Sequence, residues 1–183
     1  KIPAVGASEN QPTHLGQSHA EVEQHLRESG LTYTILRPHS FMQNQLGSLG
    51  TIKAQGATYS SIGDGKIPMV DARDVGAVAA KILQTGAHPN EIFDITGPEA
   101  ISHHEVARIL SRVAGKPVSY FAVPGAAAKK AMTDAGFPTW LADDLVTLTG
   151  IWKEGRDITI SPVAENILGR KPRTMSGGER QRV

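Results

Sequence analysis

The 183-residue chain contains no cysteine. Disulfide bonds, thiolate metal sites and a cysteine nucleophile are therefore excluded, and the composition agrees with a reducing compartment such as the cytoplasm. Aromatic residues make up only 5% of the chain, whereas hydrophobic residues make up 39%. We therefore expect a core built mainly from aliphatic side chains.

The chain also lacks a charge excess and long apolar runs. Its 19 Lys and Arg residues against 18 Asp and Glu residues give a net charge of +1. A charge so close to zero provides no basic field for a phosphate backbone, so nucleic acid is not expected as a partner. The apolar runs are too short to predict a membrane-spanning segment.

Several sequence motifs that mark nucleotide sites or nucleophiles are absent. The dinucleotide fingerprint G-x-G-x-x-G, the phosphate loop G-x-x-x-x-G-K-[ST], the pair Tyr-x-x-x-Lys and the elbow G-x-S-x-G do not occur. Gly63-Asp64-Gly65 is followed by a strand-like segment rather than a helix. We therefore predict a structural turn there.

The pattern along the chain is an alternation of helices and strands. Two capping boxes, Ser18 with Glu21 and Ser102 with Glu105, predict helix starts, and glycines predict the ends. Helices are predicted at 18–29, 40–49, 72–85, 102–114, 126–135 and 140–149, and strands at 31–37, 66–70, 91–96 and 117–123. This order predicts an α/β fold with a largely parallel sheet.

Two of these helices carry an apolar stripe that predicts their buried faces. The inward residues are expected to be Val75, Val78, Ala79, Ile82 and Leu83 in one helix, and Val106, Ile109, Leu110 and Val113 in the other.

The 7 histidines do not form a metal site by their spacing, because no two are four residues apart and no thiolate supports them. We therefore predict no metal. His19 and Glu23 are four residues apart on one helix face, where three roles stay open: a local pair, an acid–base couple, or metal ligands. His103 and His104 follow a helix cap and are expected to be exposed.

A series of motifs resembles the NmrA-like family of atypical short-chain dehydrogenases/reductases. The resemblance begins with His19-x-x-x-Glu23 and the segment 29–38, and continues through 41–44, 63–68, 71–75 and 93–98 to Gly115-Lys-Pro-Val118. Each motif is short, but their order and spacing together are fairly specific. The resemblance covers roughly residues 3 to 173.

The resemblance implies a Rossmann-type core that binds NAD(P)H, with a small α/β C-terminal lobe that closes over a small-molecule substrate. It implies an oxidoreductase acting on a small carbonyl or quinone, and its alternative is a regulatory protein that senses the dinucleotide without turnover. In the family, Arg37, Pro38, Phe41 and Asn44 lie beside the nicotinamide. The face with His19 and Glu23 takes the place where other members carry Tyr and Lys, and His19 is the candidate proton relay.

The resemblance also predicts that residues 1–173 correspond to the second part of such a protein. The segment Lys1–Ser8 matches a family strand, and no Gly-rich phosphate loop precedes it, so we expect impaired cofactor binding. An exposed sheet edge then predicts low stability and self-association.

Residues 174–183 follow a different pattern from the rest. They resemble the signature motif of ABC-transporter ATPases, which predicts a foreign or disordered tail. The plain alternative is a capping box over Ser176–Glu179 that opens a short helix.

Overall fold

A computed structural model of the chain describes residue 10 and residues 12–177. Its helices are α1 (His14–Glu28), the 3-10 helix η1 (Met42–Ser48), α2 (Leu49–Gln55), α3 (Ala72–Thr85), α4 (His103–Ala114), α5 (Gly125–Asp134), α6 (Thr139–Lys153) and α7 (Val163–Leu168). Its strands are β1 (Thr34–Pro38), β2 (Ala57–Ser60), β3 (Lys66–Ile67), β4 (Glu91–Ile95), β5 (Ile101–Ser102) and β6 (Ser119–Ala122). The predicted α/β class is confirmed. The strand expected at Lys1–Ser8 and the helix expected after Ser176 lie outside the described residues.

The strands pair two by two. β1 and β4 are parallel, with Thr34 opposite Glu91 and Pro38 opposite Ile95. β2 and β6 are also parallel, whereas the short strands β3 and β5 are antiparallel. The predicted parallel pairing is therefore confirmed for the longer strands.

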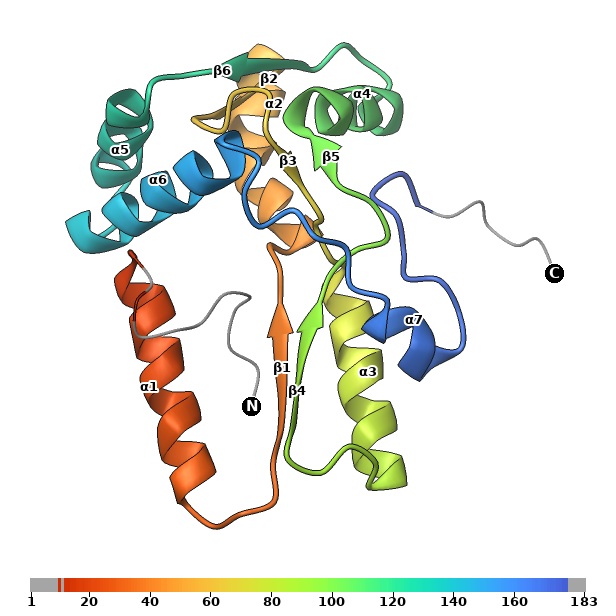
Figure 1. Ribbon diagram of the computed structural model, residues 1–183. Helices are drawn as coiled ribbons and strands as arrows, with labels where there is room; N and C mark the ends of the chain where they lie inside the picture. The colour runs from red at the N-terminus through yellow and green to blue at the C-terminus, as the bar shows by residue number, and fades with distance from the viewer. Residues whose placement is uncertain (1–9, 11, 178–183) are drawn as a thin grey trace, which may run out of the picture.

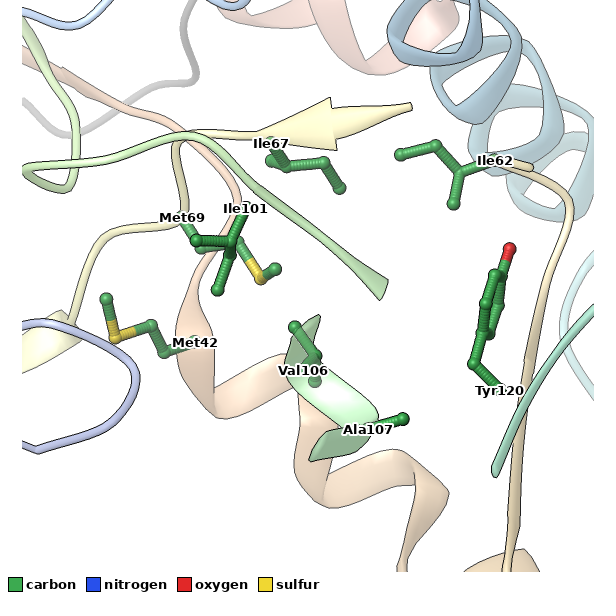
Figure 2. Packing of buried hydrophobic residues seen from close by; sticks show 8 residues of the cluster. All are labelled: Met42, Ile62, Ile67, Met69, Ile101, Val106, Ala107 and Tyr120. Atoms are coloured by element: carbon green, nitrogen blue, oxygen red, sulfur yellow. The ribbon is translucent and has the colours of Figure 1, made fainter. Parts of the chain in front are cut away.

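The elements divide into two parts (Figure 1). In what we call the sheet part, β1 and β4 lie between α1 on one side and α3 and α7 on the other. The remaining elements form what we call the lobe, in which α5 and α6 lie across the end of the sheet part. Each part has its own apolar core. The sheet core contains Leu36, Val70, Val75, Val78, Ile82, Ile95 and Ala164. The lobe core contains Met42, Ile62, Ile67, Met69, Ile101, Val106, Ala107 and Tyr120 (Figure 2).

The chain passes between the two parts at one place, which we call the neck, defined as segments 38–42, 68–71, 95–97 and 157–161. Backbone hydrogen bonds join the first three of these segments, and the side chains of Thr96 and His39 join segment 157–161 to them. The N–H of His39 donates to the carbonyl of Ile95 at 2.9 Å, and the N–H of Val70 donates to the carbonyl of Ser40 at 3.0 Å. Buried backbone groups need such partners, so the neck continues the sheet beyond its last regular pair.

Gly97 allows two of the neck segments to touch. Its N–H donates to the carbonyl of Pro68 at 3.1 Å, and a Cβ on Gly97 would lie 2.0 Å from the carbonyl oxygen of Met69. No side chain tolerates that distance from a backbone atom. Glycine is thus required by close approach of two backbones.

The N-terminus of α1 differs from the sequence prediction. The helix begins at His14, not Ser18, and Thr13 caps it by accepting from the N–H of Gly16 at 3.1 Å. The buried carboxylate of Asp144 on α6 accepts from the N–H of Leu15 at 2.8 Å and of His14 at 3.1 Å. The Ser18 prediction was wrong because this contact from a distant helix supports an earlier turn.

Asp144 fits that role electrostatically. Burial by itself raises the pKa of its carboxyl, but the hydrogen bonds from Leu15 and His14 outweigh burial and lower the pKa below its ordinary value. The carboxylate is therefore charged at the positive end of the helix dipole, where a negative charge is favourable.

Two other predicted helix starts are confirmed, whereas the helix predicted at 40–49 is the 3-10 helix η1 followed by the short helix α2. Ser102 and Glu105 form the reciprocal capping box of α4. Asp71 caps α3 by accepting from the N–H of Arg73 at 2.8 Å, and the Arg73 side chain on the same carboxylate holds the pKa of Asp71 down at about 2.

Two residues expected to face inward are exposed instead. Leu83 of α3 is 83% exposed, and Val113 of α4 is 78% exposed. Leu83 lies about 100° around the helix from Ile82. The face of α3 that is buried is narrower than the apolar face seen in the sequence, and Leu83 lies outside it. Val113 lies on the face of α4 that was predicted to point inward, but it is in the last turn of the helix. Angular patterning does not show where along its axis a helix leaves the core.

Buried Asp74 fastens the segment after α7 to α3. Its carboxylate accepts from the Arg170 guanidinium at 2.7 Å, from the backbone N–H of Arg173 at 2.6 Å and from the Arg173 guanidinium.

Within the described residues, no helix has both the length and the apolar character needed to cross a membrane.

We expect Gly97→Ala to lower the free energy of unfolding by about 2 kcal/mol or more, because the new methyl group overlaps the Met69 carbonyl and the neck must separate. The matched control is Gly76→Ala, at an exposed position of α3, where no atom lies within 4 Å of the new Cβ. This substitution should stabilise the protein by about 0.5–1 kcal/mol. Urea denaturation followed by circular dichroism measures both. Equal effects of the two substitutions would contradict the close-approach role of Gly97.

Candidate functional site

A cavity of about 470 Å³ lies beside the neck, between the end of β1 and helix α6. It is lined by His19, Pro38, His39, Ser40, Phe41, Asn44, Gln45, Ser60, Ile67, His103, Leu145, Leu148, Thr149, Trp152 and Asp157. The carboxyl ends of parallel strands are where α/β folds bind ligands, because the connections diverge there and leave a crevice. The cavity is therefore the candidate site.

The wall formed by the sheet part and the first neck segment contains most of the predicted site residues. Pro38 is buried at the end of β1, and Phe41 has extended backbone and bridges to Val70 before η1 begins. Asn44 and His19 complete this wall. The structure thus brings His19, Pro38, Phe41 and Asn44 together around one space.

Glu23 and Arg37, the other two predicted site residues, do not line the cavity. Arg37 donates from Nε to Glu23 Oε1 at 2.8 Å and from Nη2 to Glu23 Oε2 at 2.5 Å. Arg27 adds a contact of 3.0 Å, and the Glu23 side chain is fully buried. The hydrogen bond that Arg37 donates to Glu23 raises the pKa of Arg37, so the guanidinium stays charged. Of the roles left open for Glu23, the structure shows a local pair, formed with Arg37 and Arg27.

The opposite wall comes from α6 and was missed in the sequence. Leu145, Leu148, Thr149 and Trp152 line it, spaced at i, i+3, i+4 and i+7 along one helix face. That spacing is readable in the sequence. The pattern does not reveal whether such a stripe faces a core or a ligand cavity.

His39 was also missed, although it follows the Arg37-Pro38 motif directly. Its Nδ1 accepts from the N–H of Ser40 at 2.8 Å, so its Nε2 carries the proton and donates to the carbonyl of Asp157 at 3.0 Å. Asp157 has a φ of 61°, in the left-handed region that aspartate tolerates. Burial lowers the pKa of His39, so the ring is neutral at physiological pH.

The two neighbouring histidines of α4 differ in their environment. His104 is exposed, as predicted, and its Nε2 lies 3.1 Å from Asp64 Oδ1. His103 is half-buried and lines the cavity, so the prediction of an exposed residue was wrong for it. Its ring packs against Tyr120 with centroids 5.3 Å apart. Spacing alone could not separate the two, because they occupy adjacent positions in one helical turn.

The cavity wall is apolar with a few uncharged polar groups. Among the described residues that line it, none is Lys or Arg, and Asp157 is the acidic one. Nowhere in residues 12–177 do three or more His, Asp or Glu side chains gather in a way that could hold a metal ion.

Comparison with known proteins identifies a single family. The sequence profile of the NmrA-like family matches residues 5–176. The chain is 37% identical over 172 residues to the NAD(P)H azoreductase of Xenophilus azovorans, covering 94% of this chain and 60% of that protein. It is 30% identical over 138 residues to quinone oxidoreductase 2 of Escherichia coli, covering 75% of this chain and 48% of that protein.

A solved structure shares the fold. The NADPH-dependent quinone oxidoreductase of Escherichia coli in complex with NADPH superposes with a TM-score of 0.83 at 27% identity, covering 96% of this chain and 62% of that one. The chain therefore spans about half to three-fifths of the length of these relatives.

We expect Glu23→Gln to lower the free energy of unfolding by about 3 kcal/mol, since Arg37 would be left beside a neutral amide. The control Glu21→Gln changes an exposed residue of the same helix and should alter stability by less than about 0.5 kcal/mol. Thermal or urea unfolding compares them. A full-stability Glu23→Gln protein would argue against the structural ion pair and return Glu23 to the acid–base role.

Stability should fall as the pH drops from 7 to 5, in part because of His39. The unfolded histidine, with a pKa of about 6.5, takes up a proton in this range, while the folded ring, with its lowered pKa, does not. One such group contributes a slope of up to about 1.4 kcal/mol per pH unit. His39→Gln should flatten the pH dependence of urea unfolding, and His25→Gln, at an exposed position of α1, should not. Parallel curves for the natural chain and His39→Gln would refute this assignment.

Proposed function

The chain belongs to the NmrA-like family, as its motifs predicted, and we propose that it supplies the nicotinamide and substrate half of an NAD(P)H-dependent reductase. The observation that carries the proposal is the cavity at the carboxyl end of β1, the strand that pairs in parallel with β4. One wall of it holds Pro38, Phe41 and Asn44, at the positions that the family resemblance assigns to the cofactor.

The residues present fit the nicotinamide end of the cofactor. Pro38 and Phe41 offer flat apolar surfaces for a ring, and Ser40 and Asn44 offer a hydroxyl and an amide for its carboxamide. No phosphate fingerprint occurs in the 183 residues. We therefore propose that this chain by itself binds the dinucleotide weakly.

When bound, the cofactor supplies a hydride, and hydride plus one proton converts a quinone to its hydroquinone. His19 lies in the wall of the cavity and is the candidate relay for that proton. Arg37, locked by Glu23, acts on the site only through the strand that it immobilises.

The substrate class follows from the lining. With no Lys or Arg among the described lining residues and with Asp157 as the acidic one, the cavity favours a planar, uncharged acceptor over an anionic one. The relatives named for azo compounds and quinones act on acceptors of this planar type.

The test uses a joined protein, in which this chain is fused to the region of the azoreductase that it does not match. It measures NADPH oxidation by that protein with a neutral naphthoquinone and with the same ring carrying a sulfonate. We expect kcat/KM to be at least about tenfold higher for the neutral quinone, a difference of about 1.4 kcal/mol. Phe41→Leu should weaken NADPH binding about tenfold, whereas Phe121→Leu, an exposed aromatic outside the cavity, should not.

A titration with NADPH then compares the joined protein with this chain alone. Tighter NADPH binding by the joined protein is expected. NADPH binding without oxidation of any quinone would favour the sensing alternative, and failure of the joined protein to bind NADPH would overturn the proposal.

A further inference from the structure

Three histidines reach the cavity, and they differ in what their ring nitrogens do. Both nitrogens of His39 are engaged, one by Ser40 and one by Asp157. In the part of the chain that the structure describes, neither ring nitrogen of His103 has a hydrogen-bond partner. These nitrogens are not fully buried, because the unpartnered buried polar atom among the described side chains is Trp152 Nε1, so they stay accessible to water and to a ligand in the cavity.

His103 is nevertheless held in place. It is the first residue of α4, whose start is fixed by the reciprocal cap of Ser102 and Glu105. Its ring packs on Tyr120, and the Tyr120 hydroxyl donates to the carbonyls of Ser60 at 3.2 Å and Gly63 at 3.1 Å. Backbone and ring are thus both anchored, and only the nitrogens are left for something in the cavity.

The charge state of the ring suits an uncharged ligand. Burial lowers the pKa of His103, and the neighbouring His104 lowers it further, so the imidazole is neutral at physiological pH. A neutral imidazole donates one hydrogen bond from its N–H without placing a full charge in an apolar space. In such a space, a fixed donor aimed at an oxygen that gains electron density stabilises that oxygen strongly.

We propose that His103 donates a hydrogen bond to the carbonyl oxygen of the quinone-type substrate and thereby sets its orientation against α6. This assignment rests on the proposed function and adds a residue of α4, in the lobe, that contacts the substrate. His103 binds the oxygen on which negative charge builds as hydride arrives at the ring; the proton that completes the hydroquinone comes by the separate His19 route.

The kinetic test compares neighbouring histidines in the joined protein described above, because the chain by itself is proposed to bind NADPH weakly. His103→Leu should lower kcat/KM for menadione about 10- to 100-fold and leave the Kd for NADPH unchanged. His103→Gln, which keeps a donor, should recover part of that loss. His104→Leu is the matched control, since it changes the adjacent side chain, which is exposed and faces Asp64, and it should retain full activity. Equal losses in the two leucine variants, or none in His103→Leu, would overturn the proposal.

A second measurement does not need turnover. Menadione is titrated into the ¹⁵N-labelled chain without NADPH, and the imidazole resonances are followed by NMR. We expect the His103 ring nitrogens to shift and those of His104 to stay. Bound menadione that leaves the His103 resonances unmoved, or no binding at all, would refute the contact. A shifted His103 in a protein that never oxidises NADPH would instead defeat the proposed function and leave the contact standing.

Discussion

The neck is the constraint on which the rest of the structure depends. The segments that join the sheet part to the lobe are hydrogen-bonded to one another, and Gly97 lets two of their backbones touch. The ring of His39 joins a further segment through the Asp157 carbonyl. Because the two parts are fastened along this line, their surfaces diverge on one side of it, and that divergence is the cavity. The site therefore exists through the way in which the chain crosses over, not through any single motif.

Buried charges place the elements that apolar packing holds least. The single buried residue of α1 is Glu23, which is bound by Arg37 of β1, and the first turn of α1 is held by Asp144 of α6. Asp74 holds the segment after α7 in the same way. Such groups cannot be separated without leaving a charge uncompensated in the interior. They therefore specify where an element lies, regardless of how much net stability each ion pair contributes.

The cavity joins these two themes. His39 and His103 are neutral because burial lowers the pKa of each, and the α6 wall is apolar, so the polar atoms that the cavity leaves unengaged become the source of selectivity. The family supplies the expectation of a dinucleotide and a small acceptor. We propose that the dinucleotide binds against the wall at the end of β1. The acceptor then binds against the first turn of α4 and one face of α6.

Local chemistry was legible in the sequence. The Ser102–Glu105 cap, the α3 stripe from Val75 to Ile82 and the parallel character of the longer strand pairs depend on nearby residues, on periodicity or on the order of elements, and all were predicted. The start of α1, the exposure of Val113 and the burial of His103 depend on what another element brings alongside, so no local pattern carried them. By itself, the sequence determined the fold class, the family and the residues gathered on the β1 side of the cavity, but neither strand β2 nor the 3-10 form of η1. Only the tertiary structure decided that Glu23 belongs to an ion pair, that α6 forms the second wall and that His103 faces the cavity while His104 faces solvent, because long-range contacts and desolvation act between residues far apart in the chain.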